Sequence, residues 1–346
     1  MRQLVTVQKI YDIEPIEGRD RVDKAKVLGW TVIVGKGQFE EGQLVGYAEV
    51  DSLFPNNEHW KELEKFKHRI KMFKVNTPNG PVYGQGYCFS LDKLVGVIDC
   101  HEFYEGQEIT DVIGVTKWEL PEDFNLGDSD GSFPTHLIPQ TDETRIQSVK
   151  SVLEELHKRP YYIMSKIDGT SATYLINPQT NNFLSCSRNN MRKHHSISGR
   201  KCVYWDMAEK YELEKVLREF PNFALQGEIY GPSIQKNPLK ETTQKLAIFN
   251  IFNIKERRYL DLGDIKRTFE KMLKISNNLT FVPILEEGDK FNYFLDDIIQ
   301  KSIYNYPSGN PAEGIVVRPQ NEMYSQILKG RLSFKCINPE FSCKEK

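Results

Sequence analysis

The sequence changes character once, across a stretch that begins at Pro121. Before this stretch the chain has many short apolar runs that end at glycine or proline, and after it the runs are longer and more mixed. The stretch itself, PEDFNLGDSDGSFPTHLIPQ, is rich in Pro, Gly, Ser and Asp and has little periodicity, which is typical of a linker. A chain of 346 residues is long enough for two domains. We therefore expect a first domain over residues 1–120, a linker over 121–137 and a second domain over 138–346.

The first domain is predicted to be a small β-barrel. Its apolar runs are short, and Gly29 and Gly35 separate two of them from their neighbours. One helical segment, EHWKELEKF, begins at Glu58 between the predicted strands. Many short strands with glycine and proline punctuation are typical of sandwiches and barrels.

The second domain is predicted to mix helices with strands. The segment DETRIQSVKSVLEELHKR has apolar residues at helical spacing, with Asp142 near its start, and predicts one helix. The segment GRKCVYWDMAEKYELEKVLREF predicts another helical region. The runs FALQGEIYG, KLAIFNIFNI and EGIVVRP predict strands. The expected fold class of the chain is therefore α+β.

Composition excludes several kinds of protein. The net charge is only -2, so binding to nucleic acid would depend on local basic patches. The six cysteines include no CxxC pair, so zinc-site spacing is absent. The opening residues are too polar for a signal peptide, and no apolar run reaches the roughly 18 residues of a membrane span. We expect reduced thiols and a cytoplasmic or nuclear protein that is neither secreted nor bound to a membrane.

The segment YYIMSKIDGTSATYL places Lys166 at the end of one apolar run, and Asp168 and Gly169 follow before the next run begins. An Asp-Gly pair between two strands is a common hairpin signal, and a lysine beside a turn is usually solvated. A partly desolvated lysine on a rigid strand, however, can have its pKa lowered enough to act as a nucleophile. The segment alone leaves both interpretations open.

Further polar clusters follow Lys166 on strong apolar runs, and their order makes coincidence a poor explanation. They are Ser187-Arg188-Asn189, Gln226-Gly227-Glu228, Phe249-Asn250, Glu313-Gly314 and Ser333-Phe334-Lys335. Over roughly residues 138 to 341, this set resembles the covalent nucleotidyltransferase superfamily of polynucleotide ligases and RNA capping enzymes.

Two other segments narrow the resemblance. The run GWTVIVGKGQFEEGQLVGYAEVDSLFP and the later IPQTDETRIQ are similar to segments of the Naegleria- and Deinococcus-type ATP-dependent RNA ligases. The resemblance implies an N-terminal OB-type β-barrel followed by a nucleotidyltransferase (adenylation) domain, which is built on antiparallel sheets with flanking helices.

The resemblance also implies the reaction. A lysine amine attacks the α-phosphate of ATP, pyrophosphate leaves, and AMP stays bound covalently to the lysine. AMP then moves to a 5′-phosphate end, and a 3′-OH end displaces it. Such phosphoryl transfer needs positioning and charge neutralisation, here with Mg²⁺ or Mn²⁺ as cofactor. The expected partner is RNA, or an RNA-containing duplex with a nick whose 3′-OH strand is RNA, and the expected state is a monomer.

Roles for individual residues follow from the matched motifs. Lys166 is implied as the nucleophile, and Asp168 and Glu313 as carboxylates linked to the metal. The residues implied to bind the nucleotide are Arg145, Arg188, Glu228, Phe249 and Lys335. Two of these have alternatives from sequence alone: Phe249 could be an ordinary buried strand residue, and Arg145 a solvated helix charge.

Two positions depart from the family pattern. The last motif of related ligases usually has two lysines separated by one residue, but here the second place holds Ile337, and a shifted register would put Ser333 in the first place. Arg331 or Lys329 could supply the missing cation. Asn250 stands where some relatives carry aspartate. Because Lys166 is retained, we still expect activity.

The sequence is compatible with other functions. DNA ligases and capping enzymes carry an OB domain after the last motif, whereas the OB-like segment here lies upstream, which favours an RNA ligase. The choice of ATP over GTP is not fixed by the residues. A non-catalytic OB-fold nucleic-acid-binding protein is the remaining alternative, although the retained motif residues argue against it.

A basic run in the first domain is the candidate nucleic-acid surface. The segment KFKHRIKMFK interleaves cations with Phe66 and Phe73, a pattern that suits single strands or the phosphates beside a nick. A solvated barrel edge would have the same composition. The residues concerned are Lys65, Lys67, Arg69, Lys71 and Lys74.

Overall fold

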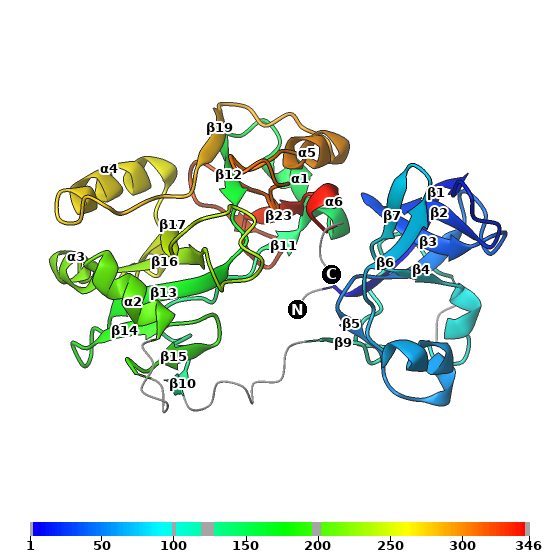
Figure 1. Ribbon diagram of the computed structural model, residues 1–346, viewed down its shortest axis with the longest axis horizontal. Coiled ribbons are helices and arrows are strands. Elements are labelled where there is room, and N and C mark those ends of the chain that lie inside the picture. The colour runs from blue at the N-terminus through cyan, green and yellow to red at the C-terminus, as the bar shows by residue number, and fades with distance from the viewer. Residues whose placement is uncertain (1–2, 99–101, 119–127, 196–201, 343–346) are drawn as a thin grey trace. The chain divides into compact units, whose positions relative to one another are not determined.

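The computed structural model describes residues 3–98, 102–118, 128–195 and 202–342. The chain divides into two compact units, Met1–Pro121 and Glu122–Lys346 (Figure 1). Residues 119–127, which include the first part of the expected linker, lie outside the described residues. No helix in the described part of the chain is long and apolar enough to cross a membrane.

The N-terminal unit is built on a five-stranded antiparallel sheet with the order β3-β2-β1-β4-β8. Its strands are β1 (Val5–Pro15), β2 (Val22–Val27), β3 (Trp30–Gly35), β4 (Leu44–Ala48) and β8 (Tyr87–Phe89). A register shift between Ile10 and Asp12 bends β1, which pairs with β4 before the shift and mainly with β2 after it. The Gln85 N–H, just before β8, donates to the Thr31 carbonyl of β3 at 2.7 Å. This hydrogen bond joins the two outer strands of the sheet, β3 and β8, and the predicted OB-type barrel is confirmed.

Smaller pairs and helices complete this unit. The pairs are β5 (Ser52–Leu53) with β9 (Thr116–Lys117) and β6 (Phe73–Thr77) with β7 (Gly80–Gly84). The 3₁₀ helices are η1 (Glu58–Phe66) and η2 (Leu91–Leu94). The first is the helix expected from Glu58, and it buries Trp60 and Leu63 in the barrel core.

The C-terminal unit contains two large sheets. The first, here the seven-stranded sheet, has the order β10-β15-β14-β13-β16-β17-β18 and is antiparallel throughout. Its strands are β10 (Ser129–Ser132), β13 (Thr170–Ile176), β14 (Phe183–Cys186), β15 (Asn190–Arg192), β16 (Phe223–Tyr230), β17 (Lys245–Asn253) and β18 (Arg258–Tyr259).

The second, the five-stranded sheet, has the order β11-β23-β20-β12-β19. Its strands are β11 (Thr144–Arg145), β12 (Tyr161–Lys166), β19 (Ile284–Gly288), β20 (Gly314–Pro319) and β23 (Phe334–Ile337). Only β11 and β23 run parallel among its pairs. A small pair, β21 (Tyr324–Ser325) with β22 (Gly330–Arg331), precedes β23.

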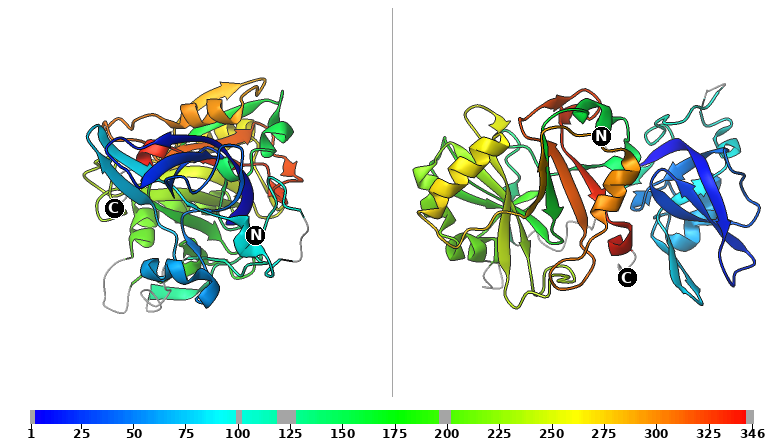
Figure 2. Two further views of the ribbon diagram at one scale, coloured as in Figure 1. Left: turned by 90° about the vertical axis from the view of Figure 1, so that its right-hand side faces the viewer. Right: turned by 90° about the horizontal axis from the view of Figure 1, so that it is seen from above.

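Helices cover the outer faces of these two sheets (Figure 2). The seven-stranded sheet packs against α2 (Val203–Lys210), α3 (Leu213–Glu219) and α4 (Leu262–Leu273). The five-stranded sheet packs against α1 (Val152–Leu156) and α5 (Leu295–Ser302). A short α6 (Pro339–Ser342) follows β23. A further hydrophobic cluster lies between the two sheets and includes Met164, Ala247, Phe249 and Val316. The α+β class and the flanking helices are confirmed.

The single helix expected over DETRIQSVKSVLEELHKR is wrong. The segment forms strand β11, a 3₁₀ turn η5 (Ile146–Ser148) and only then the five-residue α1. Strand β11 pairs Arg145 with Lys335 of β23, and the buried Gln147 side chain donates to the Ile337 carbonyl at 2.9 Å. Pairing with a distant strand therefore overrides the local helical pattern.

The hairpin interpretation of the Asp-Gly pair is also wrong. Strand β12 pairs with β19 and β20, whereas β13 pairs with β14 and β16. The chain crosses from one sheet to the other between Lys166 and Thr170. The two strands beside the pair therefore never form a ladder with each other, and the crossing lies where the sheets face one another.

Candidate active site

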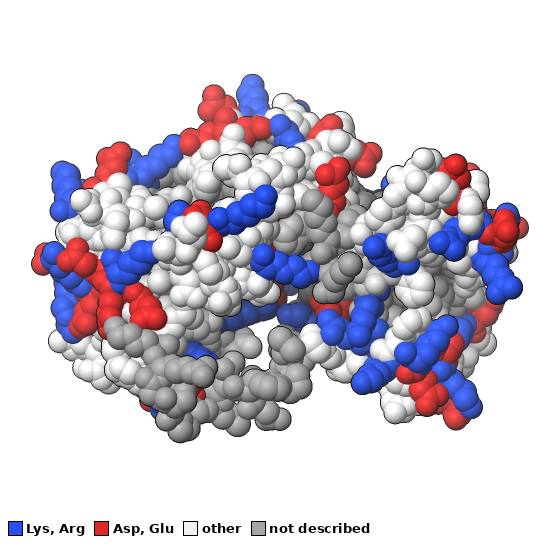
Figure 3. All heavy atoms as spheres, viewed as in Figure 1, with Lys and Arg blue, Asp and Glu red and all other residues white. Residues whose placement is uncertain are grey.

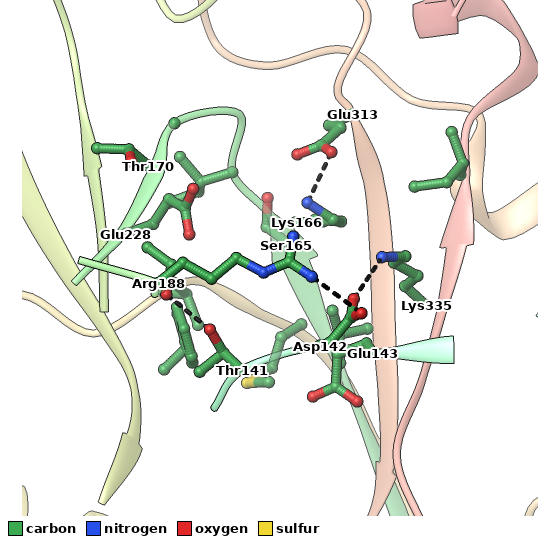
Figure 4. A pocket seen from close by; sticks show the side chains of 18 of the residues that line it. Thr141, Asp142, Glu143, Ser165, Lys166, Thr170, Arg188, Glu228, Glu313 and Lys335 are labelled. Carbon is green, nitrogen blue, oxygen red and sulfur yellow. Dashed lines mark hydrogen bonds and ion pairs between the residues drawn. The ribbon is translucent and has the colours of Figure 1, made fainter. Parts of the chain in front are cut away.

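A cavity of about 400 Å³ lies between the two sheets of the C-terminal unit. Side chains from both sheets line it, and Figure 4 shows Lys166, Glu228, Glu313, Arg188 and Lys335 around one space. Residues predicted from sequence that line this cavity are Lys166, Glu313, Glu228, Arg188, Arg145, Phe249 and Lys335. Asp168 is in the crossing segment beside them but is not one of the lining residues. The cavity thus collects motifs that are far apart in the sequence.

Lys166 ends β12, directly opposite Gly314 of β20. Its Nζ lies 2.6 Å from Oε1 of Glu313, and the two side chains are only 22% and 16% exposed. The nearest carboxylate therefore comes from the residue that immediately precedes β20. The pairing of β12 with β20 brings Lys166 and Glu313 together, which the spacing of the motifs in the sequence does not show.

Two motif glycines are required because other strands approach them closely. A Cβ on Gly169 would lie 2.2 Å from the Ile229 carbonyl oxygen, and a Cβ on Gly314 would lie 2.1 Å from the Cys336 carbonyl oxygen. Gly314 also has a φ of +146°. The glycine in each motif thus allows the chain beside Lys166 and Glu313 to pack against β16 and β23.

Three carboxylates surround the Lys166 amine and favour its protonated form, whereas a nucleophile must be neutral. Burial lowers the pKa of Lys166, but the carboxylates of Glu313, Glu228 and Asp168 outweigh burial, so the net pKa is raised. Desolvation alone therefore does not lower the pKa of Lys166 in the protein without ligands. Burial raises the pKa of Glu228 to about 8, opposed by Lys166 and assisted by Glu313 and Asp168. An excess of carboxylates surrounds one amine.

Asp142 joins two cations across the mouth of the cavity. Its Oδ2 lies 2.9 Å from Nη2 of Arg188, and its Oδ1 lies 3.7 Å from Nζ of Lys335 (Figure 4). Sequence reasoning treated Asp142 only as a helix-start residue. Its partners come from β23 and from the turn between β14 and β15, so no local pattern could have identified the contact.

One side of the cavity is apolar. Phe249 of β17 lines it together with Met164, Val282 and Val316. Phe249 is only partly buried, and its carbonyl accepts a hydrogen bond from Nη1 of Arg318 at 3.0 Å. Such a slot is suited to a flat aromatic ring, since stacking places the ring faces in contact.

Arg145 also reaches the cavity, but from strand β11 rather than from a helix. It lies beside Lys335 because β11 and β23 are paired in parallel. The solvated-helix alternative for Arg145 is therefore wrong. The two cations come from adjacent strands of the five-stranded sheet.

Among the described residues, no cation lines the cavity at the second lysine position of the last motif. Ile337 lines the cavity there, and neither Arg331 nor Lys329 is a lining residue. Arg331 instead donates from Nε to Glu322 at 2.7 Å and from Nη1 to Oδ1 of Asn250 at 2.8 Å. Arg331 is therefore engaged by Glu322 and Asn250 inside the fold and does not line the cavity.

Arg318, which sequence reasoning also missed, occupies the same buried network. Its Nη1 donates to Oδ1 of Asn250 at 2.8 Å, and its Nη2 lies 2.8 Å from Oε1 of Glu143. Asn250 thus accepts from two arginines, and it donates to Oε1 of Gln226 at 2.9 Å. A hydrophobic run ending in arginine was the only sequence signal for Arg318.

The carboxylates near Lys166 are compatible with a partly hydrated divalent cation. Oε2 of Glu313 is buried and has no hydrogen-bond partner among the described residues. Yet no group of three or more His, Cys, Asp or Glu side chains in the described ranges is arranged to hold a metal ion. Mg²⁺ keeps several waters and is often held by one or two carboxylates plus substrate phosphates. The site fits that kind of binding better than an all-protein metal cage.

Among the five cations of the basic run in the N-terminal unit, four are exposed and one is half-buried. Lys65, Lys67, Lys71 and Lys74 are exposed, while Arg69 is half-buried. The Arg69 guanidinium pairs with Asp51 at 2.6 Å and lies over the Trp118 ring, 3.2 Å from its centroid. Arg69 therefore has a structural role. On the face of this unit seen in Figure 3, Lys and Arg are mixed with Asp and Glu rather than gathered in one field.

Comparisons with known proteins agree with this geometry. A family model described as RNA ligase matches residues 159–337, and an OB-fold domain model matches residues 4–77. No curated protein sequence matches the chain.

Solved structures of Naegleria gruberi RNA ligase are similar over the whole chain. One in complex with pyrophosphate is 26% identical with a TM-score of 0.78, covering 100% of this chain and 99% of that one. A mutant with AMP and Mn is 25% identical with a TM-score of 0.79, and a mutant with ATP and Mn is 26% identical with a TM-score of 0.78; each covers 99% of both chains. The matched model spans more than half of the sequence and contains Lys166, Glu228, Glu313 and Lys335. This chain therefore belongs to the RNA ligase family.

Proposed function

We propose that this protein is an ATP-dependent RNA ligase that joins 3′-OH and 5′-phosphate ends through a lysyl-AMP intermediate on Lys166. The observation that carries the proposal is the Lys166–Glu313 pair, with 2.6 Å between Nζ and Oε1, inside a cavity that also holds Arg188, Glu228 and Lys335. The solved relatives with ATP, AMP or pyrophosphate support the same nucleotide chemistry.

In the first step, the Lys166 amine forms a bond to the α-phosphorus, and the bond from that phosphorus to the pyrophosphate oxygen breaks. The amine must first lose a proton, and Oε1 of Glu313 is within hydrogen-bond distance to accept it. Lys335, 15% exposed at its side chain, is positioned for a phosphate oxygen as a point charge. The apolar slot at Phe249 would hold adenine, and Glu228 and Arg188 the ribose.

A divalent cation, which we propose to be Mg²⁺ with Mn²⁺ as a substitute, would neutralise phosphate charge and oppose the carboxylates that raise the pKa of Lys166. Glu313 and Asp168 are the residues proposed to hold it, directly or through water. The buried and unpartnered Oε2 of Glu313 supports that assignment.

In the second step, the Lys166–phosphorus bond breaks and AMP moves to a 5′-phosphate oxygen. In the third, a 3′-OH oxygen attacks that 5′-phosphorus and AMP leaves. We propose that the natural substrate is a nick whose 3′-OH strand is RNA. An RNA end favours A-form geometry and exposes 2′-hydroxyls, so shape rather than base sequence would discriminate.

Two experiments test the proposal. Incubation with [α-³²P]ATP and Mg²⁺ should label the wild-type protein covalently, whereas Lys166→Ala should take up no label. Normal labelling of Lys166→Ala would refute the assignment of the nucleophile.

Four nicked duplexes, with RNA or DNA on each side of the nick, then test the substrate. Fast sealing should require RNA on the 3′-OH side, with either sugar accepted on the 5′-phosphate side. Equal rates with an all-DNA 3′-OH strand would favour a DNA ligase instead.

A further inference from the structure

The Tyr306 hydroxyl joins three residues around the reacting amine. The side chain is 4% exposed and belongs to the segment between α5 and β20. Its O–H donates to the Lys166 carbonyl at 2.5 Å. Its oxygen accepts from the backbone N–H of Glu313 at 3.1 Å and of Asp168 at 3.3 Å. One phenol oxygen therefore contacts the backbone of the proposed nucleophile and of both proposed metal-linked carboxylates.

These contacts lie just beyond the end of the pairing between β12 and β20. Pairing of β12 with β20 ends at Lys166 and Gly314. Asp168 and Glu313 lie just beyond this end, so the ladder does not supply partners for their N–H groups. Buried N–H groups need such partners, and the Tyr306 oxygen accepts from both.

A second tyrosine of the segment between α5 and β20, Tyr304, contacts the residues next to Glu313 and Lys166. The Tyr304 hydroxyl donates to the Gly314 carbonyl at 3.2 Å and lies 2.6 Å from Oγ of Ser165. On the other side, the Asn338 N–H donates to the Glu313 carbonyl at 3.0 Å. Glu313 is thus held at its N–H by Tyr306 and at its carbonyl by Asn338, which directly follows β23, and this leaves its backbone little freedom.

We propose that Tyr306 is a positioning residue of the ligation reaction, whose hydroxyl sets the distance between the Lys166 amine and the Glu313 carboxylate. The inference rests on the proposed function. Tyr306 would not touch the substrate. It would act through the backbone, because a shift of about 1 Å in a reacting group can reduce a rate by about 100-fold.

The test compares Tyr306→Phe with Tyr162→Phe in the full-length chain. Both changes remove a buried phenol oxygen and keep the ring, but the Tyr162 hydroxyl has no hydrogen-bond partner among the described residues. The measurement is single-turnover formation of lysyl-AMP from [α-³²P]ATP with Mg²⁺, over a range of ATP concentrations. The temperature is kept well below the melting temperature of each variant.

For Tyr306→Phe we expect the rate at saturating ATP to fall about 10- to 100-fold, with the half-saturating ATP concentration changed less than about threefold. Tyr162→Phe should match the wild type in both quantities. A merely structural role would lower the melting temperature and leave the saturating rate of the folded protein intact.

A wild-type saturating rate in Tyr306→Phe would overturn the inference, as would a loss confined to ATP affinity. If that variant does not fold, Tyr306→His is measured with the same two outcomes, because its shorter ring does not reach the hydroxyl position. Failure of the wild-type protein to take up label would instead refute the proposed function.

Discussion

The carboxylate of Asp142 bridges Arg188 and Lys335. Arg188 lies in the turn between β14 and β15 of the seven-stranded sheet, and Lys335 lies in β23 of the five-stranded sheet. Both cations line the cavity and both are proposed to meet the nucleotide. In the protein without ligands, a carboxylate therefore occupies the cationic side of the cavity, where phosphate charge would be expected.

Replacing this carboxylate with a neutral amide should strengthen phosphate binding. In Asp142→Asn, the two cations keep their charge but lose an anionic neighbour that repels phosphates. Because Asp142 is 45% exposed, water screens the effect, and we expect pyrophosphate to bind about 3- to 10-fold more tightly. Isothermal titration calorimetry with pyrophosphate measures this directly. Weaker binding would indicate that Asp142 mainly holds Arg188 and Lys335 in place.

The raised pKa of Glu228 should make stability depend on pH. Its pKa is raised by burial to about 8 in the folded protein, against an ordinary value of 4.5 for a glutamate. As pH rises from about 4.5 to 8, the unfolded chain loses this proton and the folded chain retains it, so folding becomes less favourable. Glu228→Gln removes the effect. At pH 8 the variant should be the more stable by about 1–2 kcal/mol, since the half-buried carboxyl faces a cavity that water can enter.

Thermal melting of the two proteins without nucleotide or metal, at pH 5 and pH 8, checks this sign. The difference should be large at pH 8 and nearly vanish at pH 5. A variant that melts below the wild type at pH 8 would show that the Glu228 charge stabilises the fold through Lys166.

Asn250 should matter for folding because two buried arginines depend on it. Its Oδ1 lies 2.8 Å from Nη1 of Arg318 and 2.8 Å from Nη1 of Arg331. Asn250→Ala leaves both donors without this acceptor and should cost about 2–4 kcal/mol of unfolding free energy. Urea denaturation measures the loss. Asn253→Ala, on the same strand but capping an exposed turn, is the control and should cost less than about 1 kcal/mol.

The strands that carry the site could be predicted from sequence, but their partners could not. Apolar runs before Lys166, after Glu313 and around Phe249 predicted β12, β20 and β17. The Asp-Gly pair suggested a hairpin because turn chemistry is local, whereas the crossing between sheets depends on β16 approaching Gly169.

The remaining misses have the same cause. Asp142 and Tyr306 act through contacts with residues that are distant in the sequence, and the contacts of Tyr306 are to backbone atoms. Backbone partners leave no residue pattern to recognise. The tyrosine pair in residues 304–306, just before Pro307, was the only available signal.

Removing the N-terminal unit should separate nucleotide chemistry from sealing. Every residue that lines the cavity lies in the unit Glu122–Lys346. Deletion of residues 1–121 should therefore leave lysyl-AMP formation within about threefold of the wild type. Sealing of a nicked duplex should fall about 10-fold or more, because the deletion removes exposed cations that can bind backbone phosphates.

The matched control keeps the unit and removes only those cations, by changing Lys65, Lys67, Lys71 and Lys74 to alanine in the full-length chain. This variant should label normally and seal poorly, and its defect should shrink as salt rises, since salt weakens the wild-type phosphate contacts. Normal sealing by the variant would assign these lysines to an ordinary solvated surface. Loss of labelling in a soluble, folded deletion protein would contradict the separation itself, because lysyl-AMP formation would then require residues outside the cavity.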